Sequence, residues 1–151
     1  MRIRKMIYSD LTLVVSLYQH ANLFAKKSDI FSWTKKGAEK EPDLNLVYEK
    51  KGDILGAISA ERLNNRTARI NDIAVKNDHR GKGIGKMLLW KIIKILQKKH
   101  ISKIVLWVHW TNARAIPFYY RFGFEIKKVE KTHKVSYVPD GEDIIHLERN
   151  E

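Results

Sequence analysis

The stretch IAVKNDHRGKGIGK, residues 73–86, decides the fold. A short apolar segment typical of a strand leads into a glycine-rich turn, and an amphipathic helix is predicted from Ile84 onward. The turn holds three glycines, Gly81, Gly83 and Gly85, and three basic side chains, Arg80, Lys82 and Lys86. Amides at a helix N-terminus lack intrahelical partners, and glycines let an anion approach the main chain closely. The stretch therefore predicts a phosphate-binding turn.

Two better-known phosphate loops do not fit this spacing. A dinucleotide fingerprint starting at Gly81 requires a third glycine where Lys86 stands. A Walker loop ending at Gly85 requires glycine where Arg80 stands, and Ser or Thr where Met87 stands. The predicted ligand is therefore neither NAD nor ATP.

The chain before this turn opens with a strand and a helix. Arg2 to Ile7 alternates as a strand does, and Ser9-Asp10 offers a cap for an amphipathic helix from Leu11 to Ala21. Residues 22–43 are polar around a few aromatic side chains, which predicts short helices or loop.

Three antiparallel strands are predicted next. Leu44–Glu49 and Ile54–Arg62 flank the turn at residues 51–53, and Asn64-Asn65 turns the chain into Ala68–Val75. Each consecutive pair is close enough in sequence to form a hairpin.

The remainder alternates helices and strands. Apolar spacing predicts a helix over Ile84–Lys99, and the buried-type run Ile104–Val108 then forms a strand parallel to the strand before the helix. A second helix over Asn112–Phe122 and strands at Phe124–Val129 and Asp143–Leu147 complete one α/β domain, residues 1–151.

Composition narrows the class of protein. The chain has 151 residues, 44% hydrophobic and 30% charged, which suits one globular domain. There is no cysteine, so disulfides, thiolate metal sites and cysteine nucleophiles are excluded, and no metal is predicted. No apolar window suits a signal peptide or a membrane span, which predicts a soluble cytoplasmic protein. The net charge of +12 favours an anionic partner, but the lysines are dispersed along the chain, which argues against nucleic acid.

Two motifs together resemble one family. Arg80-x-x-Gly83-x-Gly85 after Ile73-Ala74-Val75 resembles the acetyl-CoA motif of the GNAT superfamily, and NARAIPFYYRFGFE at residues 112–125 resembles its second signature. The resemblance covers roughly Leu44 to Leu147. It implies a mixed central sheet with splayed parallel strands flanked by helices, and acetyl transfer to a primary amine.

The resemblance also implies a set of residues that bind acetyl-CoA: Ile73, Ala74, Val75, Arg80, Gly81, Lys82, Gly83, Ile84, Gly85, Lys86, Asn112 and Tyr119. The backbone of Ile73 and Val75 would bind pantetheine, and the amides of the glycine-rich turn would bind pyrophosphate. Asn112 would hold the cofactor through its side chain. Tyr119 would lie beside the thioester sulfur as a catalytic acid; the alternatives are that it packs in the core or that Tyr120 takes this role.

Within the superfamily the sequence looks most like enzymes that acetylate protein N-termini, of the ribosomal-protein and archaeal type. Those enzymes carry Glu or His as the base five residues before the motif Asn, where this chain has Trp107. His109 lies two residues further along the same strand face, and Asp72 borders the cofactor strand, so either is a candidate proton acceptor. Each also has a purely structural explanation.

The absence of an evident strong base favours an α-amine substrate. At pH 7 an α-amine with a pKa of about 7.7 to 8.0 loses its proton for ~1 kcal/mol, whereas a lysine at about 10.4 costs ~4 to 5 kcal/mol. Polyamines and other small amines are the alternative, if Glu39, Glu41 and Asp43 form an acidic site that offsets the positive charge.

Two further alternatives belong to other classes. One is a basic nucleic-acid-binding module that uses Trp107, Trp110 and the lysine-rich helix. The other is a fold of this family that binds acyl-CoA without catalysis. The amine, the acyl-chain specificity, and the choice between monomer and homodimer stay open, and nucleic acid and membrane are not expected partners.

Overall fold

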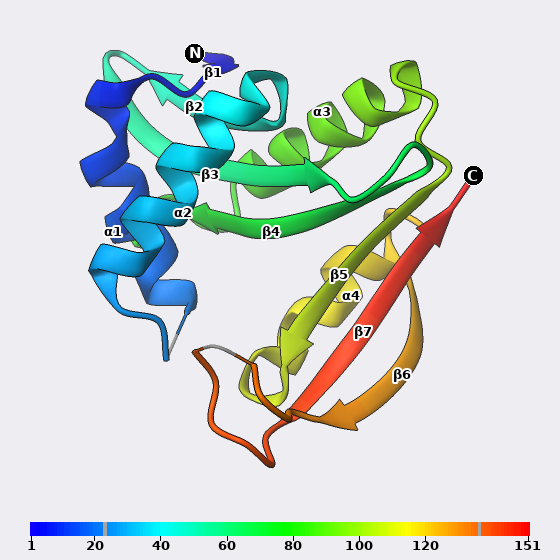
Figure 1. Ribbon diagram of the computed structural model, residues 1–151. Helices are drawn as coiled ribbons and strands as arrows, with labels where there is room; N and C mark the ends of the chain where they lie inside the picture. Colours follow the sequence, from blue (N-terminus) through cyan, green and yellow to red (C-terminus); the bar gives the residue numbers. More distant parts are fainter. Residues whose placement is uncertain (23, 136) are drawn as a thin grey trace. The chain divides into compact units, whose positions relative to one another are not determined.

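The computed structural model describes residues 1–22, 24–135 and 137–151. These residues form seven strands and four α-helices (Figure 1), with hydrogen-bonded strand order β1-β2-β3-β4-β5-β7-β6. The predicted mixed α/β fold is confirmed.

The chain divides into two compact units. The first comprises Met1–Glu61 and Ile70–Lys99, and the second comprises Arg62–Arg69 and His100–Glu151. The boundary therefore falls inside strand β4, Thr67–Val75.

The first unit combines antiparallel strands with three helices. Its helices are α1 Leu11–Ala21, α2 Lys27–Lys40 and α3 Ile84–Lys98. Its strands are β1 Arg2–Lys5, β2 Asn45–Lys50, nearly all of β3 Asp53–Arg62, and the second part of β4. Short 3-10 turns, Tyr8–Asp10, Pro42–Leu44 and Asn77–His79, precede α1, β2 and the phosphate turn.

Helices cover both faces of these strands. The Ser59 side chain on β3 contacts the Tyr18 hydroxyl of α1 at 2.8 Å. A Cβ added to Gly56, three residues earlier, would lie 2.9 Å from the Ile84 side chain of α3. Positions three apart on a strand face opposite sides, so α1 and α3 lie on opposite faces. Figure 1 shows α2 beside α1 and α3 behind β3.

The predicted amphipathic face of α3 forms much of the core of this unit. Six of its side chains are buried: Ile84, Leu88, Leu89, Ile92, Ile93 and Leu96. Each buried Leu or Ile contributes roughly 1.5–3 kcal/mol to folding. This packing fixes the start of α3, and therefore the position of the phosphate turn that precedes it.

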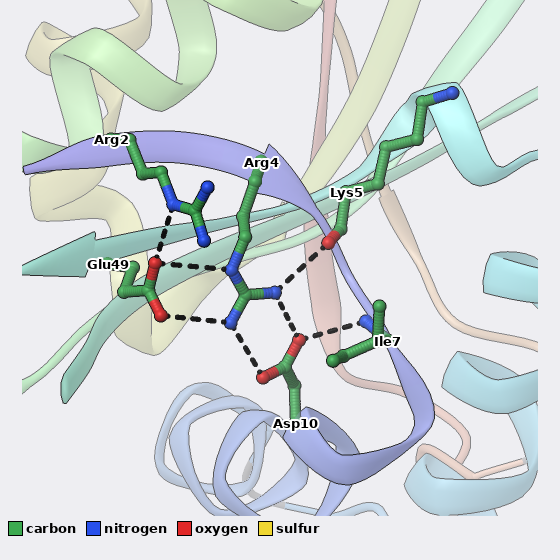
Figure 2. A network of polar contacts seen from close by, with 6 residues as sticks. All are labelled: Arg2, Arg4, Lys5, Ile7, Asp10 and Glu49. Atoms are coloured by element: carbon green, nitrogen blue, oxygen red, sulfur yellow. Dashed lines mark hydrogen bonds and ion pairs between the residues drawn. The ribbon is translucent and has the colours of Figure 1, made fainter. Parts of the chain in front are cut away.

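A charged network joins β1 to the turn before α1 (Figure 2). The guanidinium of Arg4 donates to both carboxylate oxygens of Asp10 at 2.7 and 3.0 Å, and Asp10 also accepts the Ile7 amide at 2.8 Å. Glu49 on β2 receives Arg2 at 2.7 Å and lies 3.4 Å from Arg4. Asp10 directly precedes α1 but makes no side-chain capping bond to it, so the predicted helix cap is wrong; its carboxylate instead accepts the amide of Ile7, which precedes the 3-10 turn.

Replacing Asp10 by Asn is expected to lower the free energy of unfolding by about 2 kcal/mol at pH 7, because the half-buried Arg4 guanidinium loses the nearer of its two carboxylate partners. Desolvation raises the pKa of Asp10, but the Arg4 and Ile7 hydrogen bonds together hold it below its ordinary value. The contribution is therefore present above the ordinary carboxyl pKa and is lost as the pH falls. Urea unfolding at pH 7 and pH 3 measures both effects.

Asp43 provides the control for this change. Its exposed carboxylate pairs with Lys5 at 3.0 Å and Lys99 at 3.2 Å. Surface ion pairs contribute little because water screens them, so Asp43→Asn should change stability much less than Asp10→Asn. Equal losses in the two variants would contradict the role assigned to Asp10.

The second unit is built on a three-stranded antiparallel arrangement. Its strands are β5 Lys103–His109, β6 Glu125–Lys131 and β7 Asp143–Asn150, with β7 between the other two. The first residues of β4, Thr67–Arg69, pair in parallel with Lys103–Val105. This pairing confirms the predicted parallel relation of β4 and β5; their splay stays a prediction.

One helix is longer than the sequence predicts. Residues 22–43 were predicted as short helices or loop, but 27–40 form a single helix, α2. Only Ile30 and Thr34 are buried in it, one turn apart. Its apolar periodicity is therefore too sparse to identify a helix without the contact that α2 makes with α1.

The predicted helix over Asn112–Phe122 is wrong in its extent. Trp110–Ala115 forms a 3-10 segment, and the α-helix α4 spans only Ile116–Tyr120. Proline has no amide hydrogen and favours the first turn of a helix, so Pro117 accounts for the late start of α4.

Candidate functional site

The phosphate turn in the first unit has the predicted geometry. Gly81 and Gly83 have φ values of +78° and +84°, and Gly83 directly precedes the first residue of α3. A Cβ at either glycine would meet no atom within 4 Å, so the space next to the main chain is open. The first amides of α3 lack intrahelical partners and, together with the helix dipole, favour an anion there.

Basic side chains surround this turn. Arg80, Lys82 and Lys86 are exposed. The Arg80 Nε atom also donates to the Val75 carbonyl oxygen at 3.3 Å, which ties the turn back to the end of β4. The three residues that end this strand are Ile73, Ala74 and Val75. Strand end, turn and helix start therefore form one continuous segment that presents exposed positive charge.

Gly56 on β3 is a supporting residue that the sequence did not indicate. Its missing side chain lets α3 approach the strand, since an added Cβ would lie 2.9 Å from Ile84 and 3.1 Å from Leu88. The same Cβ would lie 3.3 Å from the Ala74 carbonyl oxygen. Gly56 therefore sets the distance between the end of β4 and the first turn of α3.

Asp72, one of the two proposed proton acceptors, is a half-buried carboxylate on β4. It accepts a hydrogen bond from the Asn22 side chain at 2.8 Å. Burial raises the pKa of Asp72 to about 6, because desolvation disfavours the charged form more than the Asn22 hydrogen bond favours it. A carboxylate with this pKa is ionised at pH 7 and is a much better proton acceptor than an ordinary aspartate.

Trp107 and His109 lie on one face of β5, as the alternation predicted. Leu106 and Val108 between them are buried, whereas Trp107 and His109 are half-buried. Trp107, at the position of the family's base, stacks on Tyr137 with ring centroids 6.2 Å apart. This residue is therefore part of the packing of the second unit.

His109, the other proposed proton acceptor, is hydrogen-bonded through Nδ1 and has an acidic neighbour beyond hydrogen-bond distance at Nε2. Its Nδ1 atom accepts the Thr111 amide at 3.3 Å and lies 2.8 Å from the Thr111 hydroxyl. Its Nε2 atom lies 3.7 Å from the Glu142 carboxylate, which also accepts Trp110 Nε1 at 3.1 Å. The ring caps the 3-10 segment after β5, so its structural role is evident.

Tyr119 and Asn112 belong to the second unit. Tyr119 is 8% exposed, and its ring packs edge-on against Phe118 and Phe124 at centroid distances of 5.2 and 5.8 Å. Asn112 interrupts the 3-10 segment with φ −110° and ψ 22°, and no described residue hydrogen-bonds its half-buried side chain. That amide is available to a ligand. Tyr120 is 61% exposed.

Two of the three acidic residues considered for a polyamine site have basic partners. Asp43 pairs with Lys5 and Lys99, and Glu39 lies 3.8 Å from Lys35. These pairs reduce the negative charge that a polycation would need.

The structure thus groups the predicted residues by unit. Asp72, the end of β4 and the phosphate turn lie in the first, and His109, Asn112 and Tyr119 lie in the second. Sequence reasoning missed Asn22, for which no sequence signal exists, since only the folded structure brings it to Asp72.

The described residues contain neither a candidate metal site nor a helix that could span a membrane. No group of three or more His, Asp and Glu side chains there has the arrangement of a metal site. None of the helices in the described part combines the length and apolar character needed to cross a bilayer.

Comparison with known proteins identifies relatives along most of the chain. An uncharacterized N-acetyltransferase of Methanocaldococcus jannaschii is 36% identical over 107 residues, which cover 67% of this chain but only 46% of that protein. Spermidine N(1)-acetyltransferase of Thermoplasma acidophilum is 28% identical over 162 residues, covering 95% of this chain and 93% of the relative. Ribosomal protein bS18-alanine N-acetyltransferase of Salmonella typhimurium is 30% identical over 117 residues, covering 76% of each.

Solved structures support the fold. The crystal structure of Ard1 from Thermoplasma volcanium matches with a TM-score of 0.83 and 22% identity, covering 99% of this chain and 96% of that one. The Acetyltransferase (GNAT) family matches residues 8–124, which include the phosphate turn and most of the second motif. The chain therefore belongs to the GNAT family of acetyltransferases.

Proposed function

We propose that this acetyltransferase moves an acetyl group from acetyl-CoA to the α-amine of a protein or peptide N-terminus. The observation that carries the choice of donor is the open, glycine-lined turn at the start of α3, which suits a pyrophosphate. The choice of acceptor is supported by the relative named ribosomal protein bS18-alanine N-acetyltransferase. Other residues of this chain support the chemistry.

The proposed cofactor residues follow the family resemblance. The backbone at Ile73, Ala74 and Val75 binds pantetheine. The segment from Arg80 to Lys86 binds pyrophosphate. Asn112 has a side-chain amide without a partner among the described residues, which supports its proposed hydrogen bond to the cofactor.

The reaction needs a neutral amine, which attacks the acetyl carbon while the carbon–sulfur bond breaks. Tyr119 is the proposed hydrogen-bond donor to the departing sulfur. A phenol with a pKa near 10 facing a thiol near 8.5 makes complete proton transfer uphill by ~2 kcal/mol. Tyr119 therefore stabilises the developing thiolate chiefly by hydrogen bonding.

Of the two candidate bases, Asp72 has the stronger support. Its carboxylate has a pKa of about 6 and accepts a hydrogen bond from a neutral donor, whereas Nδ1 of His109 is engaged by Thr111 as the cap of the 3-10 segment. An α-amine with a pKa of about 7.7 to 8.0 is within reach of such a weak base, and a lysine at about 10.4 is not. The residues therefore favour N-termini over lysine side chains.

Acetylation of a polyamine is the second candidate, because the relative from Thermoplasma acidophilum is named for spermidine and aligns with 95% of this chain. The net charge of +12 and the basic partners of Glu39 and Asp43 disfavour it. We propose that the chain acts in the cytoplasm as one catalytic domain, either as a monomer or as a homodimer.

A substrate panel tests the proposed function. CoA release from acetyl-CoA is measured with peptides bearing free N-termini, with the same peptides blocked at the N-terminus but carrying a lysine, and with spermidine. Turnover confined to free N-termini supports the proposal. Turnover confined to spermidine would replace it with the polyamine function, and acetyl-CoA binding without turnover of any amine would indicate a non-catalytic binding protein.

Tyr119→Phe is expected to lower kcat about 100-fold while leaving the dissociation constant of acetyl-CoA nearly unchanged, because only the hydroxyl is removed. Steady-state kinetics and acetyl-CoA titration measure the two quantities. Tyr120→Phe is the matched control, since this neighbour is exposed and should retain full activity. Equal activity of both variants would assign Tyr119 to core packing alone.

A further inference from the structure

Asp72 occupies an unusual place for a carboxylate. It alternates along β4 with Ile70 and Ala74, which are 5% and 8% exposed, so it stands in a row of buried apolar side chains. An ionised group in such a row costs free energy unless it is paired and hydrogen-bonded.

Asn22 is the residue that holds this carboxylate. It follows the last residue of α1, and its backbone amide donates to the Gln19 carbonyl oxygen at 3.2 Å. Its side-chain Nδ2 donates to the Tyr18 carbonyl oxygen at 3.0 Å and to Asp72 Oδ1 at 2.8 Å. Both amide hydrogens are therefore used, and the end of α1 fixes the direction from which Asp72 is held.

The partner of Asp72 is neutral, which sets it apart from the other buried carboxylate of this unit. Asp10 is neutralised by Arg4, and its pKa lies below the ordinary value. Asp72 receives only the Asn22 hydrogen bond from the described side chains, and burial raises its pKa to about 6. A neutral donor orients a carboxylate but leaves its charge available to an incoming cation.

Among the described residues, the state of Asp72 is set by its burial and by Asn22. Desolvation and the Asn22 bond are the two causes of its shifted pKa. The titratable neighbour is the Tyr18 phenol on α1; burial and the nearby Asp72 charge raise its pKa, and its hydroxyl contacts Ser59 of β3 at 2.8 Å. Tyr18 therefore stays neutral and does not compete as a proton acceptor.

We propose that Asn22 is a positioning residue that holds the Asp72 carboxylate to take the proton from the substrate's ammonium group. This inference rests on the proposed transfer of acetyl to an amine. The ammonium gives one proton to Asp72, which later returns it to water, and the neutral amine attacks the acetyl carbon. The carbon–sulfur bond breaks, and the second nitrogen proton passes to the CoA thiolate, so that amide and free thiol form.

The test is the pH dependence of kcat/KM for a peptide whose α-amine is the acceptor. For the wild type we expect a bell-shaped profile of kcat/KM against pH. Its acidic side, the lower limb, should have its midpoint near the Asp72 pKa of about 6, and its basic side, the upper limb, should follow the substrate amine, whose pKa is about 7.7 to 8.0. Asn22→Ala should move the lower limb up by about half to one pH unit, because a hydrogen bond that favours the charged carboxylate is lost. The plateau should fall roughly 10-fold.

Controls separate positioning from a structural role. Asp72→Asn should abolish the lower limb. Asn45→Ala is the matched asparagine variant, since Asn45 Nδ2 donates to the Glu41 carbonyl oxygen at 2.9 Å after α2 and contacts no carboxylate in the described chain. The lower limb of the Asn45→Ala pH profile should stay where it lies in the wild type. Asn22→Ser keeps a short hydrogen-bond donor, so its lower limb should lie between those of the wild type and Asn22→Ala. Acetyl-CoA titration shows that each variant is folded.

Three results would overturn the inference. An unmoved lower limb in Asn22→Ala, with the limb lost in Asp72→Asn, would make Asn22 merely structural. A lower limb that persists in Asp72→Asn would place the proton acceptor elsewhere, although the acetylation of N-termini would stand. A wild-type protein that acetylates no amine would instead reject the proposed function itself.

Discussion

Asp72→Asn is expected to stabilise the protein at pH 7 by about 2–3 kcal/mol and to lower kcat/KM roughly 100-fold. The pKa of the folded-state carboxyl is about 6, compared with an ordinary value of 3.8. The folded state therefore loses stability as the pH rises from the ordinary value through 6, because the buried group must ionise. Asparagine has the same shape and can accept the Asn22 hydrogen bond without ionising. The activity loss is modest for a general base because an α-amine needs little help to lose its proton.

Urea unfolding at pH 4 and pH 7 tests the stability effect. The variant and the wild type should have similar free energies of unfolding at pH 4, and the variant should gain its advantage by pH 7. Asp10→Asn is the internal comparison, because its carboxylate has a cationic partner and its loss should destabilise the protein at pH 7. A destabilised Asp72→Asn at both pH values would mean that Asp72 is stabilised by its surroundings when charged.

The elements predicted most accurately are those with one buried face, because that face gives a regular spacing of apolar residues in the sequence. The helix from Ile84 matched α3 to within one residue at its end, because its apolar face is continuous and a left-handed glycine precedes it. The hairpin around Lys51-Gly52 was also correct, since both residues have positive φ. Elements held mainly by a neighbour, as α2 is, give too little apolar periodicity to be recognised alone.

The part of the candidate site that lies within one stretch of sequence could be predicted, and the part that depends on tertiary contacts could not. The turn from Arg80 to Lys86 is contiguous, so glycine spacing and charge indicate its chemistry directly. The role of Asp72 depends on desolvation and on Asn22, 50 residues away in sequence. Gly56 matters only because α3 packs over it. Such relations arise from tertiary contacts, which no single stretch of sequence encodes.

Gly83→Val is expected to weaken acetyl-CoA binding at least about 100-fold. Gly83 has φ +84°, a conformation that a β-branched residue rarely adopts, so the turn must shift or store about 1–2 kcal/mol of strain. The added side chain would also project into the open space beside the first amides of α3. Both effects act on the groups proposed to bind pyrophosphate, so calorimetric titration with acetyl-CoA should show the loss directly.

Gly52→Val separates the two effects. Gly52 also has a positive φ, +81°, and open space where its Cβ would be, but it lies in the turn between β2 and β3. The two variants should lose similar stability, because the backbone strain is the same, while only Gly83→Val should lose acetyl-CoA. If both variants bind acetyl-CoA as tightly as the wild type, the turn before α3 does not bind the cofactor. Equal loss in both would show that binding responds to general destabilisation, and the assignment of the phosphate turn would then fail.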